Sequence, residues 1–281
     1  MPANKTETPP DGAARPPLPG YTAAMPPRSD HDSDPPSSPR PLVRTRGNRR
    51  TLEFENGEIQ SEMLLSQPDK LVLAYARAMM CFALFVPQPR HILMVGLGGG
   101  SLVKFCHRHF PHTRITVLEI SAEVIALREA FQVPPDDARL RIVHGDAADF
   151  VCAAPGRFDV ILVDGFDAAG MPAALGSAAF YRDCRRALFD GGVLVANVLS
   201  YDPCHDAIVA RIEQAFSDRV CDFPGIAGNN HLLFALRAPT GAASRAALRQ
   251  EAFARRRGLG LRVLNWLLPR ALLAWLTRRP V

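Results

Sequence analysis

The chain has 281 residues, 47% of them hydrophobic, and a formal net charge of +5. This composition excludes a fibrous, collagen-like or wholly disordered protein, and it suits one large α/β domain with appendages or two small domains. The positive charge is concentrated in residues 241–281, with nine arginines and one acid, while residues 47–240 carry about −4, so no nucleic-acid partner is expected.

The first 88 residues contain two regions of different character. Residues 1–46 hold twelve of the 25 prolines, and we predict that they form a disordered arm because they cannot bury enough apolar surface. Residues 47–88 are predicted to form a short β-hairpin followed by a helix. Arg50 to Leu64 alternates around Asn56-Gly57, a strong hairpin turn signal, and a run with helical period follows from Leu71 to Val86.

Strands and helices alternate from residue 89 to residue 239. The predicted strands are 91–95, 114–119, 140–143, 158–163 and 193–198, with two more near 219–223 and 231–236. The predicted helices are 102–109, 122–131, a short one near 148, 177–188 and 205–216. This order predicts an α/β fold with a doubly wound, mostly parallel, seven-stranded Rossmann-like sheet and an antiparallel edge.

The C-terminal extension, residues 240–281, is rich in arginine and is predicted to be helical and amphipathic. Its Leu- and Trp-rich part, residues 258–277, contains Arg262 and Arg270 with Pro269 between them, which argues against a simple membrane span. Two interpretations stay open. The segment packs on a neighbouring domain or subunit, or it lies on a membrane surface.

A glycine-rich turn follows the first predicted strand of the sheet. It contains Gly96, Gly98, Gly99 and Gly100, which let the backbone turn sharply and approach a ligand closely. The spacing does not match the dinucleotide fingerprint G-x-G-x-x-G, because Ser101 stands where its last glycine would be. The turn therefore indicates a nucleoside site, with a purely structural tight turn as the alternative.

Acidic residues follow the next two strands. Glu119 ends the second strand, where a carboxylate can accept both ribose hydroxyls of a nucleoside, although it could also be a solvated carboxylate at a strand end. Asp146 follows the third strand and can accept the exocyclic amine of an adenine. A glycine turn and two acids in this order predict an adenosine pocket along the carboxyl edge of the sheet.

Two further carboxylates, Asp164 and Asp167, follow the fourth predicted strand. They could hold a cationic amine and take its proton as the nitrogen attacks an electrophilic carbon. The alternative role for Asp164 is to cap a helix. In either case the pair lies at the mouth of the same predicted crevice.

These residues together resemble the spermidine synthases, or polyamine aminopropyltransferases, within the AdoMet-dependent methyltransferase folds. The resemblance spans about residues 53–236 and is most specific in three places, which are the segment 163–173 with Phe180-Tyr181, the Gly57-x-x-Gln60 pattern, and the glycine turn. It implies that Gln60 contacts the donor, that Asp164 is the base, and that Asp167 and Tyr181 bind the acceptor. It also implies S-adenosylmethionine or its decarboxylated form as co-substrate, with a small-molecule amine or similar compound as acceptor. The family commonly pairs subunits through its N-terminal region, which is short in this chain, so a homodimer is one option and the oligomeric state stays open.

The sequence departs from that family at two positions. Gly99 stands where the family has an aspartate that binds the aminopropyl amine, and Leu73 to Arg77 replaces the family's Tyr-His-Glu stretch. Loss of an acid beside the donor favours S-adenosylmethionine itself, and hence methyl transfer. Aminopropyl transfer, methyl transfer to an unknown small acceptor, and a nucleoside-binding scaffold without turnover therefore all stay open.

The remaining signals concern metals, redox state and location. The six cysteines include no C-x-x-C pair and are expected to be reduced, mostly buried thiols. Cys106, His109 and His112 have helical spacing but no evident fourth ligand, so no metal is predicted. The N-terminus lacks an apolar signal region, and we expect a cytoplasmic protein, with contact at a membrane surface as an option through residues 258–277.

Overall fold

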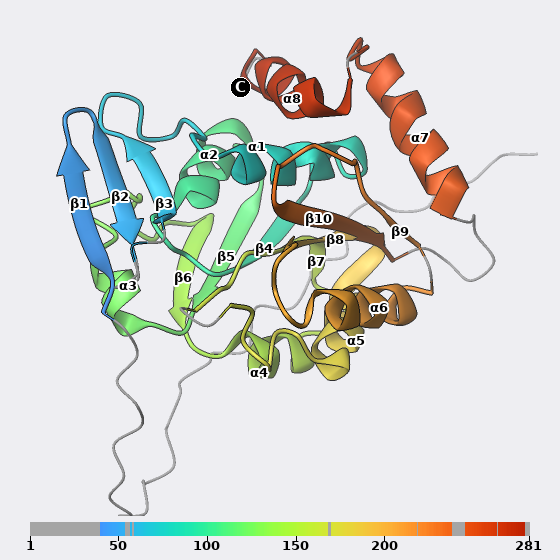
Figure 1. Cartoon of the computed structure of the whole chain (residues 1–281), viewed down its shortest axis with the longest axis horizontal. Helices are drawn as coiled ribbons and strands as arrows, with labels where there is room; N and C mark the ends of the chain where they lie inside the picture. Colours follow the sequence, from blue (N-terminus) through green and yellow to red (C-terminus); the bar gives the residue numbers. More distant parts are fainter. Residues whose placement is uncertain are drawn as a thin grey trace, which may run out of the picture. The chain divides into compact units, whose positions relative to one another are not determined.

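The structure is a computed structural model that describes residues 40–53, 57, 59–167, 170–217, 219–237, 245–262 and 264–278. The first 39 residues of the predicted arm and Asn56 of the predicted hairpin turn lie outside the described residues. The fold predicted from the sequence is confirmed. It is an α/β fold with a mostly parallel seven-stranded sheet (Figure 1).

The large sheet has the strand order β6-β5-β4-β7-β8-β10-β9. Strands β6, β5, β4, β7 and β8 are parallel, and β10 is antiparallel to its neighbours β8 and β9. Every residue of β4 and β7 is buried, as expected for central strands covered on both faces. The strands are β4 (His91–Val95), β5 (Arg114–Glu119), β6 (Leu140–His144), β7 (Phe158–Val163), β8 (Leu188–Leu199), β9 (Val220–Cys221) and β10 (Asn230–Leu236).

Helices cover both faces of this sheet, and each face has its own apolar core. One face carries α1 (Ala74–Met79), the 3-10 helix η1 (Met80–Leu84), α2 (Ser101–His109) and α3 (Ala122–Ala126). The same face also carries α7 (Arg245–Gly258) and α8 (Leu268–Thr277), and η2 (Asn265–Leu267) lies between them in the chain. The other face carries α4 (Ala147–Cys152), α5 (Ala178–Ala187) and α6 (His205–Ala215).

A separate three-stranded antiparallel sheet precedes the large one. It contains β1 (Leu42–Arg46), β2 (Arg49–Glu53) and β3 (Ile59–Leu64), in that order. Strands β2 and β3 are the predicted hairpin. The prediction that the arm extends to residue 46 is wrong for 42–46, because these residues pair with β2 across a tight turn in which Gly47 has a φ of +55°.

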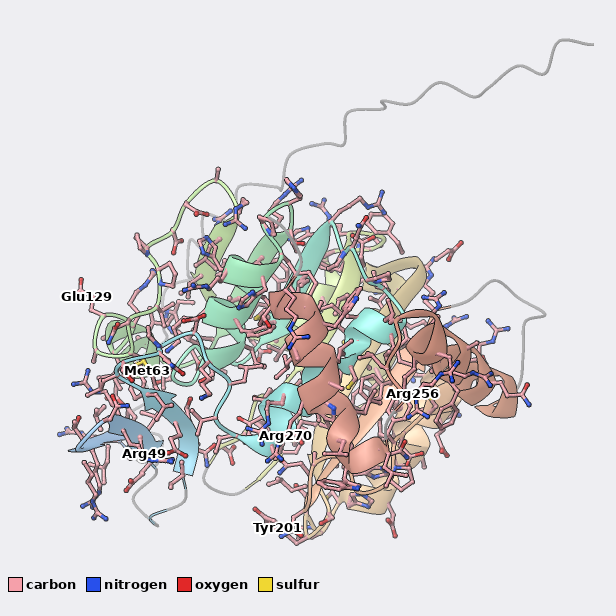
Figure 2. All side chains as sticks on the ribbon, turned by 90° about the horizontal axis from the view of Figure 1, so that it is seen from above. Arg49, Met63, Glu129, Tyr201, Arg256 and Arg270 are labelled. Carbon is pink, nitrogen blue, oxygen red and sulfur yellow. The ribbon has the colours of Figure 1, made fainter. Side chains whose placement is uncertain are left out.

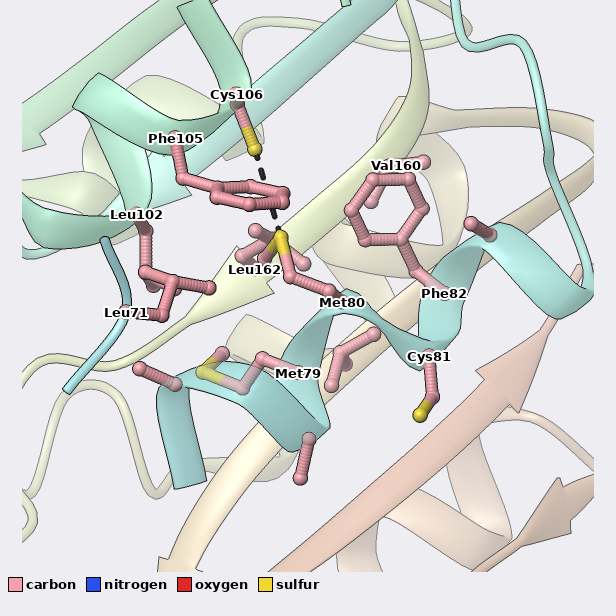
Figure 3. Packing of buried hydrophobic residues seen from close by; sticks show 14 of the residues in the cluster. Leu71, Met79, Met80, Cys81, Phe82, Leu102, Phe105, Cys106, Val160 and Leu162 are labelled. Atoms are coloured by element: carbon pink, nitrogen blue, oxygen red, sulfur yellow. Dashed lines mark hydrogen bonds between the residues drawn. The ribbon is translucent and has the colours of Figure 1, made fainter. Parts of the chain in front are cut away.

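The predicted helix over 71–86 is shorter and irregular. After six residues of α1 it tightens into η1, whose five residues are all buried. Figure 3 shows Met80 of η1 pointing toward α2, where Sγ of Cys106 lies 3.7 Å from its Sδ, while Cys81 points away from α2. Because η1 is buried on all sides and not only along one apolar stripe, contacts with its neighbours hold it in place.

The C-terminal extension packs on this same segment. Leu268, Leu272 and Leu276 of α8 are buried against α1 and η1, and Figures 1 and 2 show α8 lying across α1. The apolar face of the predicted amphipathic helix is thus used within the chain. Leu264 and Trp266 are exposed, and contact of residues 258–277 with a membrane surface or a second subunit stays a prediction. No helix among the described residues is long and apolar enough to cross a membrane.

Candidate functional site

The candidate site lies where the order of the strands reverses. From β4 the chain moves outward through β5 to β6, then returns to β7 on the other side of β4. Crevices at the carboxyl ends of strands beside such a switch point are where ligands bind in open α/β sheets. The glycine turn follows β4 and Asp164 follows β7, so the two predicted features flank the switch point.

The glycine turn and the Asp164 backbone are in close contact. Gly96 has a φ of +95°, and a β-carbon added there would lie 2.4 Å from the carbonyl oxygen of Asp164. The backbone nitrogen of Asp164 also donates a hydrogen bond to the carbonyl oxygen of Val95, with a length of 2.9 Å. Gly96 therefore has to be glycine for this close approach, and Gly98 and Gly100 continue the turn into α2.

Gly99 is enclosed by two other segments. A β-carbon at this position would lie 2.7 Å from Oγ of Ser61 on β3 and 2.8 Å from a ring carbon of Phe131. Ser61 is buried, and its Oγ lies 3.3 Å from Oγ of Ser101 at the start of α2. A side chain at residue 99 therefore requires both Ser61 and Phe131 to shift.

Glu119 and Asp146 both interact with backbone N–H groups at the carboxyl edge. Oε2 of Glu119 accepts a hydrogen bond from the nitrogen of Leu97 (2.8 Å), and Oε1 accepts one from Ser121 (2.9 Å). Glu119 is therefore a buried part of the glycine turn and not a solvated strand end. Asp146 caps α4, with Oδ1 accepting from the nitrogen of Ala148 (2.7 Å). A carboxylate oxygen has more than one lone pair, so both side chains retain acceptor capacity.

Asp164 is the centre of a small polar cluster. Its Oδ1 accepts a hydrogen bond from Nδ2 of Asn197 on β8 (2.9 Å), and the Tyr75 hydroxyl on α1 also bonds to its side chain. Burial raises the pKa of Asp164 to about 6, while the bonds from Asn197 and Tyr75 act in the opposite direction. A carboxylate with this pKa is suited to accept a proton near neutral pH.

Tyr75 joins this cluster to the small sheet. Its hydroxyl also lies 3.4 Å from the backbone carbonyl oxygen of Gln60 on β3. Burial and the neighbouring Asp164 raise the pKa of Tyr75, so the hydroxyl stays protonated and donates. No helix begins at Asp164, since α5 starts at Ala178 with Ser177 as its cap, so the helix-cap alternative for Asp164 is wrong.

The sequence pattern alone does not reveal the roles of Tyr75 and Asn197. Tyr75 lies in the stretch from Leu73 to Arg77 that departs from the family, and Asn197 lies in the apolar strand β8. A polar side chain in the middle of a buried strand was the available signal for Asn197, because such groups need a partner. Asn197 is 1% exposed, and that partner is Asp164.

The other predicted site residues are placed differently. Gln60 is half-buried on β3, and Asp167 is exposed in a tight turn closed by two backbone hydrogen bonds with Gly170. Tyr181 is fully buried in the core on the opposite face of the sheet. The structure thus brings together the glycine turn, Glu119 and Asp164, while contact of Tyr181 with a substrate stays a prediction. No group of three potential metal ligands occurs among the described residues.

The chain is similar in sequence to proteins of known family. A family model, the spermine/spermidine synthase domain, matches residues 72–221. The polyamine aminopropyltransferase of Chromobacterium violaceum is 38% identical over 215 residues, which cover 76% of this chain and 82% of that protein.

Two solved structures are similar as well. A probable spermidine synthase from Corynebacterium glutamicum has a TM-score of 0.61 at 22% identity, covering 78% of this chain and 89% of that one. Human methyltransferase-like protein 13, in complex with SAH, has a TM-score of 0.55 at 25% identity, covering 66% and 91%. Both share the fold described above.

Proposed function

Because this chain belongs to the spermine/spermidine synthase family, we propose that it transfers an aminopropyl group from decarboxylated S-adenosylmethionine to a small primary amine. The observation that carries this proposal is the placement of Asp164. It lies beside the glycine turn, it is held by Tyr75 and Asn197, and burial raises its pKa to about 6. A base of this strength next to a nucleoside site suits deprotonation of an ammonium group.

The donor would lie along the carboxyl edge of the sheet. In this proposal the backbone of residues 96–100 approaches the donor, Glu119 accepts hydrogen bonds from the ribose hydroxyls, and Asp146 accepts one from the adenine amine. Gln60, on the adjacent β3, contacts the rest of the donor. The free lone pairs of the two carboxylates and the compact glycine turn fit such a ligand.

The reaction needs alignment more than activation, because a sulfonium donor is already reactive. Asp164 takes one proton from the acceptor's ammonium group, and Asp167 contributes negative charge that holds the acceptor. The neutral nitrogen then attacks the aminopropyl carbon that is attached to sulfur. A C–N bond forms, the C–S bond breaks, and its electron pair stays on sulfur, which becomes a neutral thioether.

A second function, methyl transfer from S-adenosylmethionine, is favoured by one observation. The position of the family's aspartate is closed by Ser61 and Phe131, so no carboxylate from residue 99 repels the carboxylate of an intact methionine moiety. The same Asp164 could orient the acceptor in that reaction. The two functions differ in the carbon that is transferred and in the nucleoside that is released.

The experiment is a transfer assay with the wild-type protein and Asp164→Asn on a panel of primary diamines. We expect methylthioadenosine with the decarboxylated donor, and a loss of at least about 100-fold in kcat for the variant with unchanged donor affinity. Full activity of Asp164→Asn would overturn the role of Asp164. Release of S-adenosylhomocysteine instead would establish the second function, and absence of donor binding would exclude both.

A further inference from the structure

Asn197 has one polar atom that the fold leaves without a partner. Its Nδ2 donates to Asp164, but its Oδ1 is fully buried and has no hydrogen-bond partner among the described residues. A buried acceptor without a donor costs about 1–3 kcal/mol. Such an atom in a native fold calls for an explanation, and a ligand is one.

The orientation of this amide is set by Asp164. If the amide were turned over, its oxygen would lie 2.9 Å from Oδ1 of Asp164, and two oxygens without a proton between them repel each other. The nitrogen therefore faces the carboxylate. The oxygen is left as a second acceptor on the residue that directly contacts the proposed base.

Asn197 also lies on the face of the sheet that carries α1 and Tyr75. Along β8 the side chains of Val193 and Val195 belong to the same core as α1, and those of Leu194 and Ala196 belong to the opposite core. Because successive side chains of a strand point to opposite faces, Asn197 lies on the α1 side, where Tyr75 approaches Asp164. The unpartnered oxygen and the base thus belong to one cluster.

We propose that Asn197 is a specificity residue whose amide oxygen accepts a hydrogen bond from the nucleophilic nitrogen of the acceptor. This inference rests on the proposed function. An ammonium nitrogen gives one proton to Asp164 and still has another N–H for Asn197. A hydroxyl has a single O–H, so it satisfies Asp164 and leaves the amide oxygen unpaired. The site thereby selects an amine over an alcohol of the same shape.

The same contact has a second consequence, for the base itself. The hydrogen bond from Nδ2 favours the ionised form of Asp164 and so lowers its pKa against the effect of burial. Packing at position 197 without this hydrogen bond would bury Asp164 but would not favour its ionised form. The pH dependence of the reaction therefore reports on the Nδ2 contact, and the preference for an amine over an alcohol reports on Oδ1.

The test compares the wild type with Asn197→Leu and Asn197→Ser, with donor affinity as the check of an intact site. For both variants we expect kcat/KM for a primary diamine to fall about 10- to 100-fold, while the affinity of its hydroxyl analogue, measured by inhibition, changes less than about threefold. For Asn197→Leu the acidic limb of kcat/KM should move to higher pH. Thr116→Val is the matched control, because Thr116 is a buried polar residue that bonds His91 instead.

The outcomes are distinguishable. Variants that keep donor affinity, an unchanged acidic limb and wild-type selectivity would refute the role of Asn197 while leaving aminopropyl transfer intact. If the variants do not fold, the wild type alone decides, since equal affinity for the diamine and its hydroxyl analogue contradicts the proposal. A wild type that binds donor but transfers nothing to any amine refutes the proposed function itself.

Discussion

A β-carbon on Gly96 would lie 2.4 Å from the carbonyl oxygen of Asp164, so the glycine turn and the proposed base are positioned by one backbone contact. This contact makes Gly96→Ala a sensitive test of the site. An alanine here would have to adopt a φ of +95°, which is strained for a residue with a β-carbon. Its β-carbon would also clash with backbone atoms of Asp164, and no side-chain rotation relieves that clash. We expect a lower melting temperature and at least a tenfold loss of donor affinity in calorimetry.

Gly191→Ala is the control for the backbone strain. Gly191 also has a positive φ, +80°, but nothing lies within 4 Å of an added β-carbon. This variant should lose about 1–2 kcal/mol of stability from strain and keep its donor affinity. If both variants lose donor affinity equally, the contact with Asp164 is not what the site requires.

Gly99→Asp tests whether the family's missing acid can be restored. Ser61 and Phe131 lie 2.7 and 2.8 Å from the added β-carbon, so we expect destabilisation by several kcal/mol and no gain in preference for the decarboxylated donor. Thermal melts and calorimetry with both donors measure this. A double variant, Gly99→Asp with Ser61→Gly, should recover part of the stability. A stable single variant with a stronger preference for the decarboxylated donor would show that the packing around residue 99 adapts.

The sequence predicts those residues of the site that directly follow a strand, and it does not predict those that come from a distant segment. The glycine turn, Glu119, Asp146 and Asp164 each follow a strand, and parallel strands bring their carboxyl ends to one edge, so their proximity follows from the pattern. Tyr75 comes from a separate helix. Its contact with Asp164 depends on how α1 packs on the sheet, which no spacing in the sequence encodes.

The differences between the fold predicted from the sequence and the observed fold have similar physical causes. Proline-rich composition favours a disordered arm up to residue 46, but pairing with β2 overrides it over Leu42–Arg46. The predicted helix over 122–131 ends at Ala126, after which Gln132 takes a positive φ of +54° and Phe131 packs beside Gly99. In both cases contacts with distant residues outweigh the local preference.

The acidic limb of the activity should report on Asp164. Its pKa of about 6 predicts that kcat/KM falls about tenfold per pH unit below pH 6, because the protonated carboxyl cannot accept a proton. Tyr75→Phe removes a hydrogen bond that favours the ionised form, so the limb should move to higher pH. A pH–rate series on both proteins checks this. An unchanged limb in Tyr75→Phe would mean that Tyr75 does not interact with the titrating group.

Asp164 should also lower stability at neutral pH. Its pKa is raised from the usual 3.8 to about 6 in the folded chain, so the folded state binds this proton more tightly than the unfolded state. The resulting contribution to the free energy of unfolding is fully present below pH 3.8 and is lost as the pH rises through 6. Asn at this position does not titrate. Asp164→Asn should therefore be more stable than the wild type by about 1–3 kcal/mol at pH 8 and equally stable near pH 3.5. Denaturant titrations at the two pH values measure the difference, and a constant difference would contradict the assigned pKa.

The identity of the transferred group is the central claim, and a competition experiment tests it most directly. The wild-type protein is incubated with a primary diamine and equal amounts of S-adenosylmethionine and its decarboxylated form, and all products are identified by mass spectrometry. Aminopropyl transfer predicts a diamine enlarged by one aminopropyl group together with methylthioadenosine. A methylated product together with S-adenosylhomocysteine would contradict it.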